Sequence, residues 1–241
     1  MQIGRKLIHL ESVDSTNNYT ANLVKSEGLS SRTVILADEQ FAGRGQRGAE
    51  WVVDPGMNLT FSVYLEVVNL SVENQFDLSK IVALSICHFL EKKGIVAEIK
   101  WPNDILVKGH KISGVLIENI ISSSGSIKSV VGIGINVNQT RFGKFDATSI
   151  QCELGTFYPI QQALFSFIES FNLIADELMD APALLNERYL NKLYQYKAKK
   201  MYKDASGIFE GQIQGIEQSG KLIVLKDNQE VSYDLKEITF L

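Results

Sequence analysis

Residues 43–48 read Gly-Arg-Gly-Gln-Arg-Gly, a composition suited to enclosing a small anionic ligand. The three glycines allow left-handed backbone conformations and a close approach to a ligand. Arg44 and Arg47 carry planar guanidinium groups that donate hydrogen bonds to phosphate and carboxylate oxygens. The segment also spells G-x-G-x-x-G, the dinucleotide-binding fingerprint, which requires a strand before it and a helix directly after it.

The residues around this segment do not fit a dinucleotide-binding unit. Residues 33–37 are apolar and β-branched, as a preceding strand requires. However, residues 51–53 favour extended backbone, and Asp-Pro-Gly at 54–56 favours a turn that would interrupt a helix. Residues 59–65 then alternate with a period of two, which predicts a strand. We therefore interpret residues 43–48 as a ligand-enclosing loop rather than part of a Rossmann fold.

Three further polar motifs lie where strands end or turn, the usual place for catalytic groups. Residues 100–104 read Lys-Trp-Pro-Asn-Asp, residues 111–114 read Lys-Ile-Ser-Gly, and residues 132–136 read Gly-Ile-Gly-Ile-Asn. Glycines inside a strand indicate close approach of a ligand or of another part of the chain. With the glycine loop, these motifs supply four basic side chains and one carboxylate: Arg44, Arg47, Lys100, Lys111 and Asp104.

This set of groups favours chemistry that depends on positioning and charge neutralisation. The sequence offers no evident Ser–His–Asp triad, and its three histidines and two cysteines lack metal-ligand spacing. We expect Cys87 and Cys152 to be reduced thiols. Nucleotidyl or phosphoryl transfer with Mg²⁺ needs cations around a developing charge more than it needs a nucleophile. Asp104 is the candidate metal ligand, because Mg²⁺ takes few protein carboxylates and uses phosphate oxygens as well.

The hydrophobic pattern predicts the elements that must hold these motifs. We expect helices over 16–25 and 76–93, two more between 160 and 196, and strands over 6–11, 33–37, 59–65, 97–101, 105–107, 111–117 and 130–137. Residues 108–109 are expected at a hairpin corner, 122–126 in a polar turn and 197–200 in a solvated linker. From residue 202 onward, alternating strands with turns at 219–220 and 227–228 indicate a small β-barrel.

The sequence thus predicts an α+β protein with two domains. Residues 1–196 form a mixed, mostly antiparallel sheet covered by helices, and residues 197–241 form the β-barrel. With 45% hydrophobic and 22% charged residues, the composition is that of a soluble globular protein. A net charge of −4 gives no reason to expect nucleic-acid or membrane binding, and no apolar run suggests a signal peptide or a membrane span. We therefore expect a cytoplasmic protein.

The ordered motifs resemble those of the biotin–protein ligases, strongly over residues 5–140 and more loosely over the C-terminal β segment. The shared segments are residues 14–17, 40–48, 51, 100–104, 111–116 and 132–136. The resemblance implies the biotin–lipoate ligase fold, related to class II synthetases, with an SH3-like final domain. It also implies synthesis of biotinyl-5′-adenylate from biotin and ATP with Mg²⁺, and transfer of biotin to a lysine of carrier domains of acetyl-CoA carboxylase and related carboxylases. Whether the protein is a homodimer stays open.

Carried over position by position, the resemblance implies three groups of site residues. The biotin-binding group is Ser15, Thr16, Asn17, Gln40, Gly43, Gly45 and Gly114. The nucleotide-binding group is Arg44, Arg47, Trp51, Lys100, Asn103 and Asn136. Lys111, Arg44 and Asp104 are implied as the catalytic group, with Asp104 also as a metal ligand. Lys111 and Arg44 would offset the repulsion between the biotin carboxylate and the α-phosphate.

Two features depart from the family pattern, and two alternative functions stay open. Gln46 stands where the family often has arginine, so we expect retention of the adenylate to differ. The segment before Ser15 is too short for the helix-turn-helix of members that also repress transcription, so we expect the short form. The alternatives are a lipoate or octanoate ligase or transferase, and a sensor that binds the adenylate without transfer. Ser15, Thr16 and Gln40 favour biotin, because an acyl tail would leave their polar groups unpaired.

Overall fold

The computed structural model describes residues 2–26, 28–67, 75–121 and 127–241 of the chain. Within these ranges the side chains of Arg47, Val67 and Ile121 are not described. The polar turn expected at 122–126 lies outside the described residues. No helix in the described ranges combines the length and apolar character that crossing a bilayer requires.

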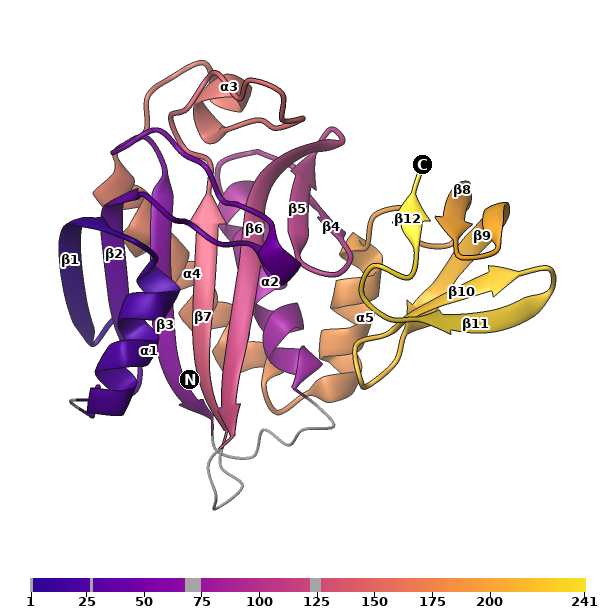
Figure 1. The fold of residues 1–241 in the computed structure, drawn as a ribbon, viewed down its shortest axis with the longest axis horizontal. Helices are drawn as coiled ribbons and strands as arrows, with labels where there is room; N and C mark the ends of the chain where they lie inside the picture. Colours follow the sequence, from indigo (N-terminus) through magenta and orange to yellow (C-terminus); the bar gives the residue numbers. More distant parts are fainter. Residues whose placement is uncertain (1, 27, 68–74, 122–126) are drawn as a thin grey trace.

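A seven-stranded sheet forms the centre of the larger domain, in the order β1-β2-β3-β7-β6-β5-β4 (Figure 1). The first pair, β1 with β2, is parallel, and the other neighbouring pairs are antiparallel. This confirms the predicted mixed, mostly antiparallel sheet. The strands are β1 (Lys6–Val13), β2 (Thr33–Gln40), β3 (Leu59–Val67), β4 (Glu98–Lys100), β5 (Asp104–Val107), β6 (His110–Ile121) and β7 (Ile127–Ile135).

The alternation of side chains along β3 explains how the sheet separates the hydrophobic core from the face that carries α1. Successive side chains of a strand point to opposite faces. Phe61 is buried against Phe167 of α4, with ring centroids 5.2 Å apart, whereas Ser62 contacts α1 on the other face. The helices α2, α4 and α5 cover the first face, and α1 covers the second (Figure 1). The helices are α1 (Thr16–Ser26), α2 (Phe76–Glu91), α3 (Ile150–Leu154), α4 (Ile160–Leu178) and α5 (Pro182–Lys192).

The C-terminal segment forms a five-stranded antiparallel sheet, in the order β11-β10-β9-β8-β12, consistent with a small SH3-like domain. The turn at 227–228 is confirmed, since Asp227 and Asn228 both have positive φ angles, as tight hairpins require. The strands are β8 (Lys199–Asp204), β9 (Gly207–Ile216), β10 (Leu222–Lys226), β11 (Gln229–Tyr233) and β12 (Thr239–Phe240).

The expectation of a solvated linker at 197–200 is wrong for residues 199 and 200. Lys199 and Lys200 begin β8, where they pair with Gln212 and Gly211 of β9. Both lysines are exposed, and in this strand Tyr202 is the buried side chain. A basic run is compatible with a strand whose faces are mostly solvated, and composition alone did not distinguish that strand from a linker.

Trp101 joins the two parts of the molecule. Its indole is 5% exposed, and its Nε1 donates to the Gly220 carbonyl oxygen at 2.9 Å. Gly220 also lies against Phe76, so an added Cβ there would be 2.6 Å from the ring. The hydrophobic core continues from the large sheet into residues such as Tyr202 and Leu222. The division expected between residues 196 and 197 therefore stays a prediction.

Asp204 holds the C-terminal sheet together through a cluster of hydrogen bonds and generates a prediction about acid stability. Its carboxylate accepts from Lys226 Nζ at 2.6 Å, from Ser206 Oγ at 2.6 Å and from Tyr233 Oη at 2.9 Å. The bonds from Lys226 and Ser206 hold the pKa of Asp204 well below its ordinary value. A carboxylate whose pKa is lowered by folding stabilises the folded state above its unfolded pKa, and this contribution is lost as the pH falls.

We expect Asp204→Asn to lower the urea midpoint of unfolding near pH 7 and to have less effect as the pH falls below about 4, where the unfolded carboxyl is protonated. Urea titrations followed by circular dichroism at several pH values measure this difference. Glu230→Gln, at an exposed position on β11, is the control. A difference between Asp204→Asn and the parent that is equal at all pH values would contradict the prediction.

Candidate ligand-binding site

A pocket of about 190 Å³ lies on the face of the large sheet that carries α1, beside the glycine–arginine loop formed by residues 43–51. It brings together most of the residues that the sequence singled out, from α1, β2, the loop, β5 and β6. These are Ser15, Thr16, Asn17, Gln40, Arg44, Gly45, Trp51, Asn103, Asp104, Lys111 and Gly114.

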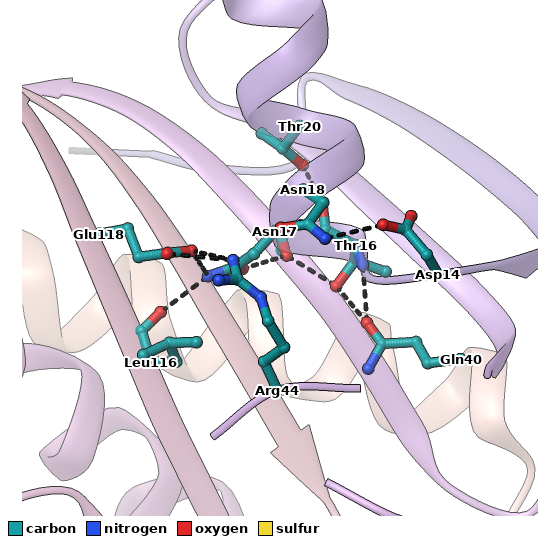
Figure 2. Close-up of polar contacts among 10 residues, drawn as sticks. Asp14, Thr16, Asn17, Asn18, Thr20, Gln40, Arg44, Leu116 and Glu118 are labelled. Atoms are coloured by element: carbon teal, nitrogen blue, oxygen red, sulfur yellow. Dashed lines mark hydrogen bonds and ion pairs between the residues drawn. The ribbon is translucent and has the colours of Figure 1, made fainter. Parts of the chain in front are cut away.

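One end of the pocket is a network of hydrogen-bonding groups around Thr16 and Asn17 (Figure 2). Helix α1 begins at Thr16, whose backbone N–H has no acceptor within the helix. Gln40 Oε1 accepts from this N–H at 2.7 Å and from Thr16 Oγ1 at 2.9 Å. Ser62 of β3 lies beneath, with its Oγ 2.7 Å from Thr16 Oγ1 and 2.6 Å from Asn17 Oδ1. The start of α1 is therefore tied to two strands of the sheet.

The opposite end of the pocket is charged. Lys111 Nζ lies 2.6 Å from Asp104 Oδ1, across the antiparallel pair β5 and β6. The same ammonium lies 5.7 Å from the centroid of the Trp51 ring. Gly114 leaves room for the lysine chain, since an added Cβ there would be 3.2 Å from both Lys111 Cε and Nζ. The polar and the charged ends thus face one cavity.

The glycine–arginine loop closes on itself above the pocket. Trp51 N–H donates to the Gly43 carbonyl oxygen at 3.0 Å, and Gly45 N–H donates to the Ala49 carbonyl oxygen at 2.6 Å. A Cβ at Gly43 would lie 2.4 Å from the Trp51 carbonyl oxygen, so only glycine fits this close approach. The side chain of Arg44 extends to β6, where its Nη2 lies 3.0 Å from each carboxylate oxygen of Glu118 (Figure 2).

The glycines of β7 make room for side chains of this protein itself. An added Cβ at Gly132 would lie 2.4 Å from Asn17 Oδ1, and one at Gly134 would lie 2.3 Å from Trp51 Cε2. The predicted close approach is therefore present, and both approaching groups line the pocket. Among the described residues, Trp51 Nε1 and Thr60 Oγ1 are buried without a hydrogen-bond partner, although both residues line the pocket. A polar ligand that reaches these atoms can satisfy them.

Three residues implied by the resemblance do not line the pocket, and the side chain of a fourth is not described. Gly43 shapes the loop but does not line the pocket. Lys100 Nζ lies 5.5 Å from the Phe240 ring, beside the C-terminal sheet. Asn136 is 4% exposed, and its Nδ2 donates to the Thr148 carbonyl oxygen at 3.0 Å. The side chain of Arg47 lies outside the described part of the structure.

Sequence reasoning missed three polar residues that contribute to the site: Thr60, Ser62 and Glu118. The period-two alternation of β3 contained a signal for the first two, since polar residues there lie opposite the apolar face. Glu118 is the acidic residue of β6 and directly follows the apolar residues 115–117, which is the same kind of signal that identified Lys111.

A family model described as the biotin/lipoate A/B protein ligase family matches residues 9–138. The chain belongs to this family. Its fold agrees with that of a biotin protein ligase from Aquifex aeolicus determined in complex with biotin and ATP, with a TM-score of 0.80, 26% identity and 98% of both chains covered. The biotin/lipoate ligase fold is thus shared along nearly the whole chain.

Two curated proteins are similar to this chain over about half of its length. The biotin–[acetyl-CoA-carboxylase] ligase of Paracoccus denitrificans is 40% identical over 131 residues, which cover 53% of this chain and 53% of that protein. The bifunctional ligase/repressor BirA of Bacillus subtilis is 33% identical over 138 residues, which cover 57% of this chain and 42% of that protein. The matched segment thus spans about half the length of these two curated relatives.

The contact between Trp51 and Gly134 generates a prediction about the shape of the pocket. We expect Gly134→Ala to displace the Trp51 ring, because overpacking costs ~1–3 kcal/mol and the loop moves more readily than the sheet. Tryptophan fluorescence measures the change, since Trp101, the only other tryptophan, is buried away from the pocket. Gly215→Ala is the control, because a Cβ there would be 4.0 Å from its nearest neighbour, Ile223 Cδ1. Equal emission from both variants would contradict the prediction.

Proposed function

We propose that this protein is a biotin–protein ligase that activates biotin with ATP and transfers it to a lysine of a biotin carboxyl carrier domain. The observation that carries the proposal is the pocket itself, which joins a hydrogen-bonding end around Thr16 and Gln40 to an end with the cation Lys111, and Arg44 of the loop also lines it. Biotin has the same two ends, a ureido ring and a carboxylate. The family and its curated ligases support the same assignment.

In the first step, a carboxylate oxygen of biotin attacks the α-phosphorus of ATP. A bond forms between this oxygen and phosphorus, the bond to the β-phosphate oxygen breaks, and pyrophosphate leaves. Two anions must approach each other, and at 4 Å their repulsion is about 4 kcal/mol at an effective dielectric constant of about 20. Lys111 and Arg44 offset this repulsion, and they stabilise the transition state because they are held in place beforehand.

In the second step, the neutral amine of the acceptor lysine attacks the acyl carbon of biotinyl-5′-adenylate. The amide bond forms, the bond to the phosphate oxygen breaks, AMP leaves and the amine releases a proton. The closed loop at 43–51 limits access of water to the adenylate in the meantime. Gln46 lines the pocket within this loop, where it adds no second cation.

Asp104 is the carboxylate best placed to assist Mg²⁺. Among the described residues, no three His, Cys, Asp or Glu side chains gather as a metal site would require. This donor set fits Mg²⁺ only when substrate phosphates complete its coordination, as is usual for this ion. The bound ion would neutralise phosphate charge. A reaction that consumes ATP, together with the free thiols Cys87 and Cys152, supports a cytoplasmic location.

The polar end of the pocket favours biotin over lipoate or octanoate. Ser15 and Thr16 are each 3% exposed, and Thr16 and Gln40 already form a hydrogen-bonded pair at this end. A purely apolar acyl chain would desolvate the Ser15 hydroxyl and Gln40 Nε2, which have no hydrogen-bond partner among the described contacts, at a cost of about 1–3 kcal/mol for each buried group. A ureido ring offers both donors and an acceptor, so it can satisfy them.

An ATP–pyrophosphate exchange assay with biotin, lipoate and octanoate tests the proposed substrate. We expect exchange with biotin and at most about 1% of that rate with the other acids, since the buried polar groups would be left unpaired. Addition of a biotin carboxyl carrier domain should then give one labelled lysine. Exchange with lipoate or octanoate alone would indicate a different acyl ligase, and exchange without labelling would indicate an adenylate sensor.

Lys111→Ala should reduce the rate of adenylate formation by about 100- to 1000-fold, the effect expected from removing one preorganised electrostatic group. The fold should be retained, because Lys111 and Asp104 are both partly exposed. Lys128→Ala is a matched control, since Lys128 lies on β7 with a similar exposure and pairs with Glu66 at 3.3 Å. Near-normal turnover by Lys111→Ala would remove this lysine from the mechanism.

A further inference from the structure

Glu118 connects the glycine–arginine loop to the polar end of the pocket (Figure 2). Its carboxylate accepts from Arg44 Nη2 at 3.0 Å on each oxygen and from Asn17 Nδ2 at 2.8 Å. We propose that Glu118 is a positioning residue, which holds Arg44 over the pocket and fixes the orientation of the Asn17 amide. The functional part of this inference rests on the proposed function, whereas the structural part can be tested without it.

The surroundings of Asn17 show why its amide has one orientation. Its Nδ2 faces two groups that can only accept, the Glu118 carboxylate and the Leu116 carbonyl oxygen at 3.2 Å. Its Oδ1 therefore faces Ser62, whose hydroxyl donates at 2.6 Å. The side chain is 3% exposed and its Oδ1 lies close to Gly132. A flipped amide would direct its oxygen toward the carboxylate, which repels it.

The same hydrogen bonds continue to Gln40, on the other side of the loop entry. Ser62 Oγ lies 2.7 Å from Thr16 Oγ1, and the backbone N–H of Thr16 donates to Gln40 Oε1 at 2.7 Å. Gln40 and Arg44 flank residues 41–43, the entry to the loop. A single connected network therefore holds the side chains on both sides of this entry, and Glu118 is its only carboxylate that accepts from Arg44 among the described contacts.

The ion pair between Arg44 and Glu118 sets the position of the Arg44 side chain and adds little to the stability of the fold. The two side chains are 44% and 39% exposed, and ion pairs with this exposure contribute little to the free energy of unfolding. A variant without the carboxylate should therefore fold. Its guanidinium, however, would lose the group that directs it across the pocket, and a residue expected to meet the acyl phosphate would sample many positions.

The test compares Glu118→Gln with Glu177→Gln, which removes the carboxylate of another exposed pair. Glu177 and Arg188 are 41% and 39% exposed and lie on α4 and α5, so the control has the same chemistry outside the pocket. Hydrogen exchange of residues 43–51 is measured in the protein without substrates. We expect exchange in this loop to rise about fivefold in Glu118→Gln, the upper end for an exposed ion pair, and to stay unchanged in Glu177→Gln.

Kinetics supply the second measurement. We expect Glu118→Gln to raise the KM for biotin and the escape rate of the adenylate by about fivefold, while kcat for pyrophosphate exchange changes less than about twofold. Arg44→Ala is then combined with Glu118→Gln. If Glu118 acts through Arg44, the double variant should be no worse than Arg44→Ala alone, whereas independent roles give effects that multiply.

Each result decides the inference. Faster loop exchange together with non-additive kinetics supports it. Unchanged loop exchange in Glu118→Gln overturns it, and so do kinetic effects of Glu118→Gln and Arg44→Ala that multiply. If the parent protein makes no adenylate from biotin, the proposed function fails, and the exchange measurement alone still supports or overturns the anchoring of the loop by Glu118.

Discussion

The pairing of each cation in the pocket with a carboxylate is the interaction on which the rest of the site depends. Lys111 with Asp104 and Arg44 with Glu118 place two positive charges beside one cavity while limiting their mutual repulsion. An arriving anion then meets cations that are already oriented and whose carboxylate partners lie on strands of a rigid sheet. Pairs that are partly exposed can exchange partners at small cost, because their attraction is screened by water.

The backbone of the sheet is what allows these side chains to converge. Gly114, Gly132 and Gly134 lie on the adjacent strands β6 and β7, and side chains from a helix, a loop and a strand occupy the space where their Cβ atoms would be. With larger residues there, Asn17 and Trp51 would stand away from the sheet, and the pocket floor would be lost. The small residues thus determine the depth of the site, and the charged residues determine what it binds.

Local pattern predicted the sheet and the longer helices, and it singled out Lys111, Asp104 and the glycines because they stand out against apolar strands. The family resemblance supplied other pocket residues, among them Ser15, Gln40 and Trp51. The contacts of Glu118 could not be predicted in this way, since its partners Asn17 and Arg44 lie 101 and 74 residues away in the chain. Lys100 and Asn136 were assigned to the site because they belong to the motifs at 100–104 and 132–136. The direction of a side chain, however, depends on strand register and on the segments that pack beside it. Lys100 Nζ lies over the Phe240 ring of the C-terminal sheet, and Asn136 Nδ2 donates a hydrogen bond to the Thr148 carbonyl oxygen.

The hydrogen bond from Trp101 to the Gly220 carbonyl oxygen connects the C-terminal sheet to the turn at residues 101–103. Trp101 precedes Asp104 by three residues, so this turn leads directly into the Lys111–Asp104 pair. The C-terminal segment thus supports the same short stretch of chain that sets the position of the Asp104 carboxylate.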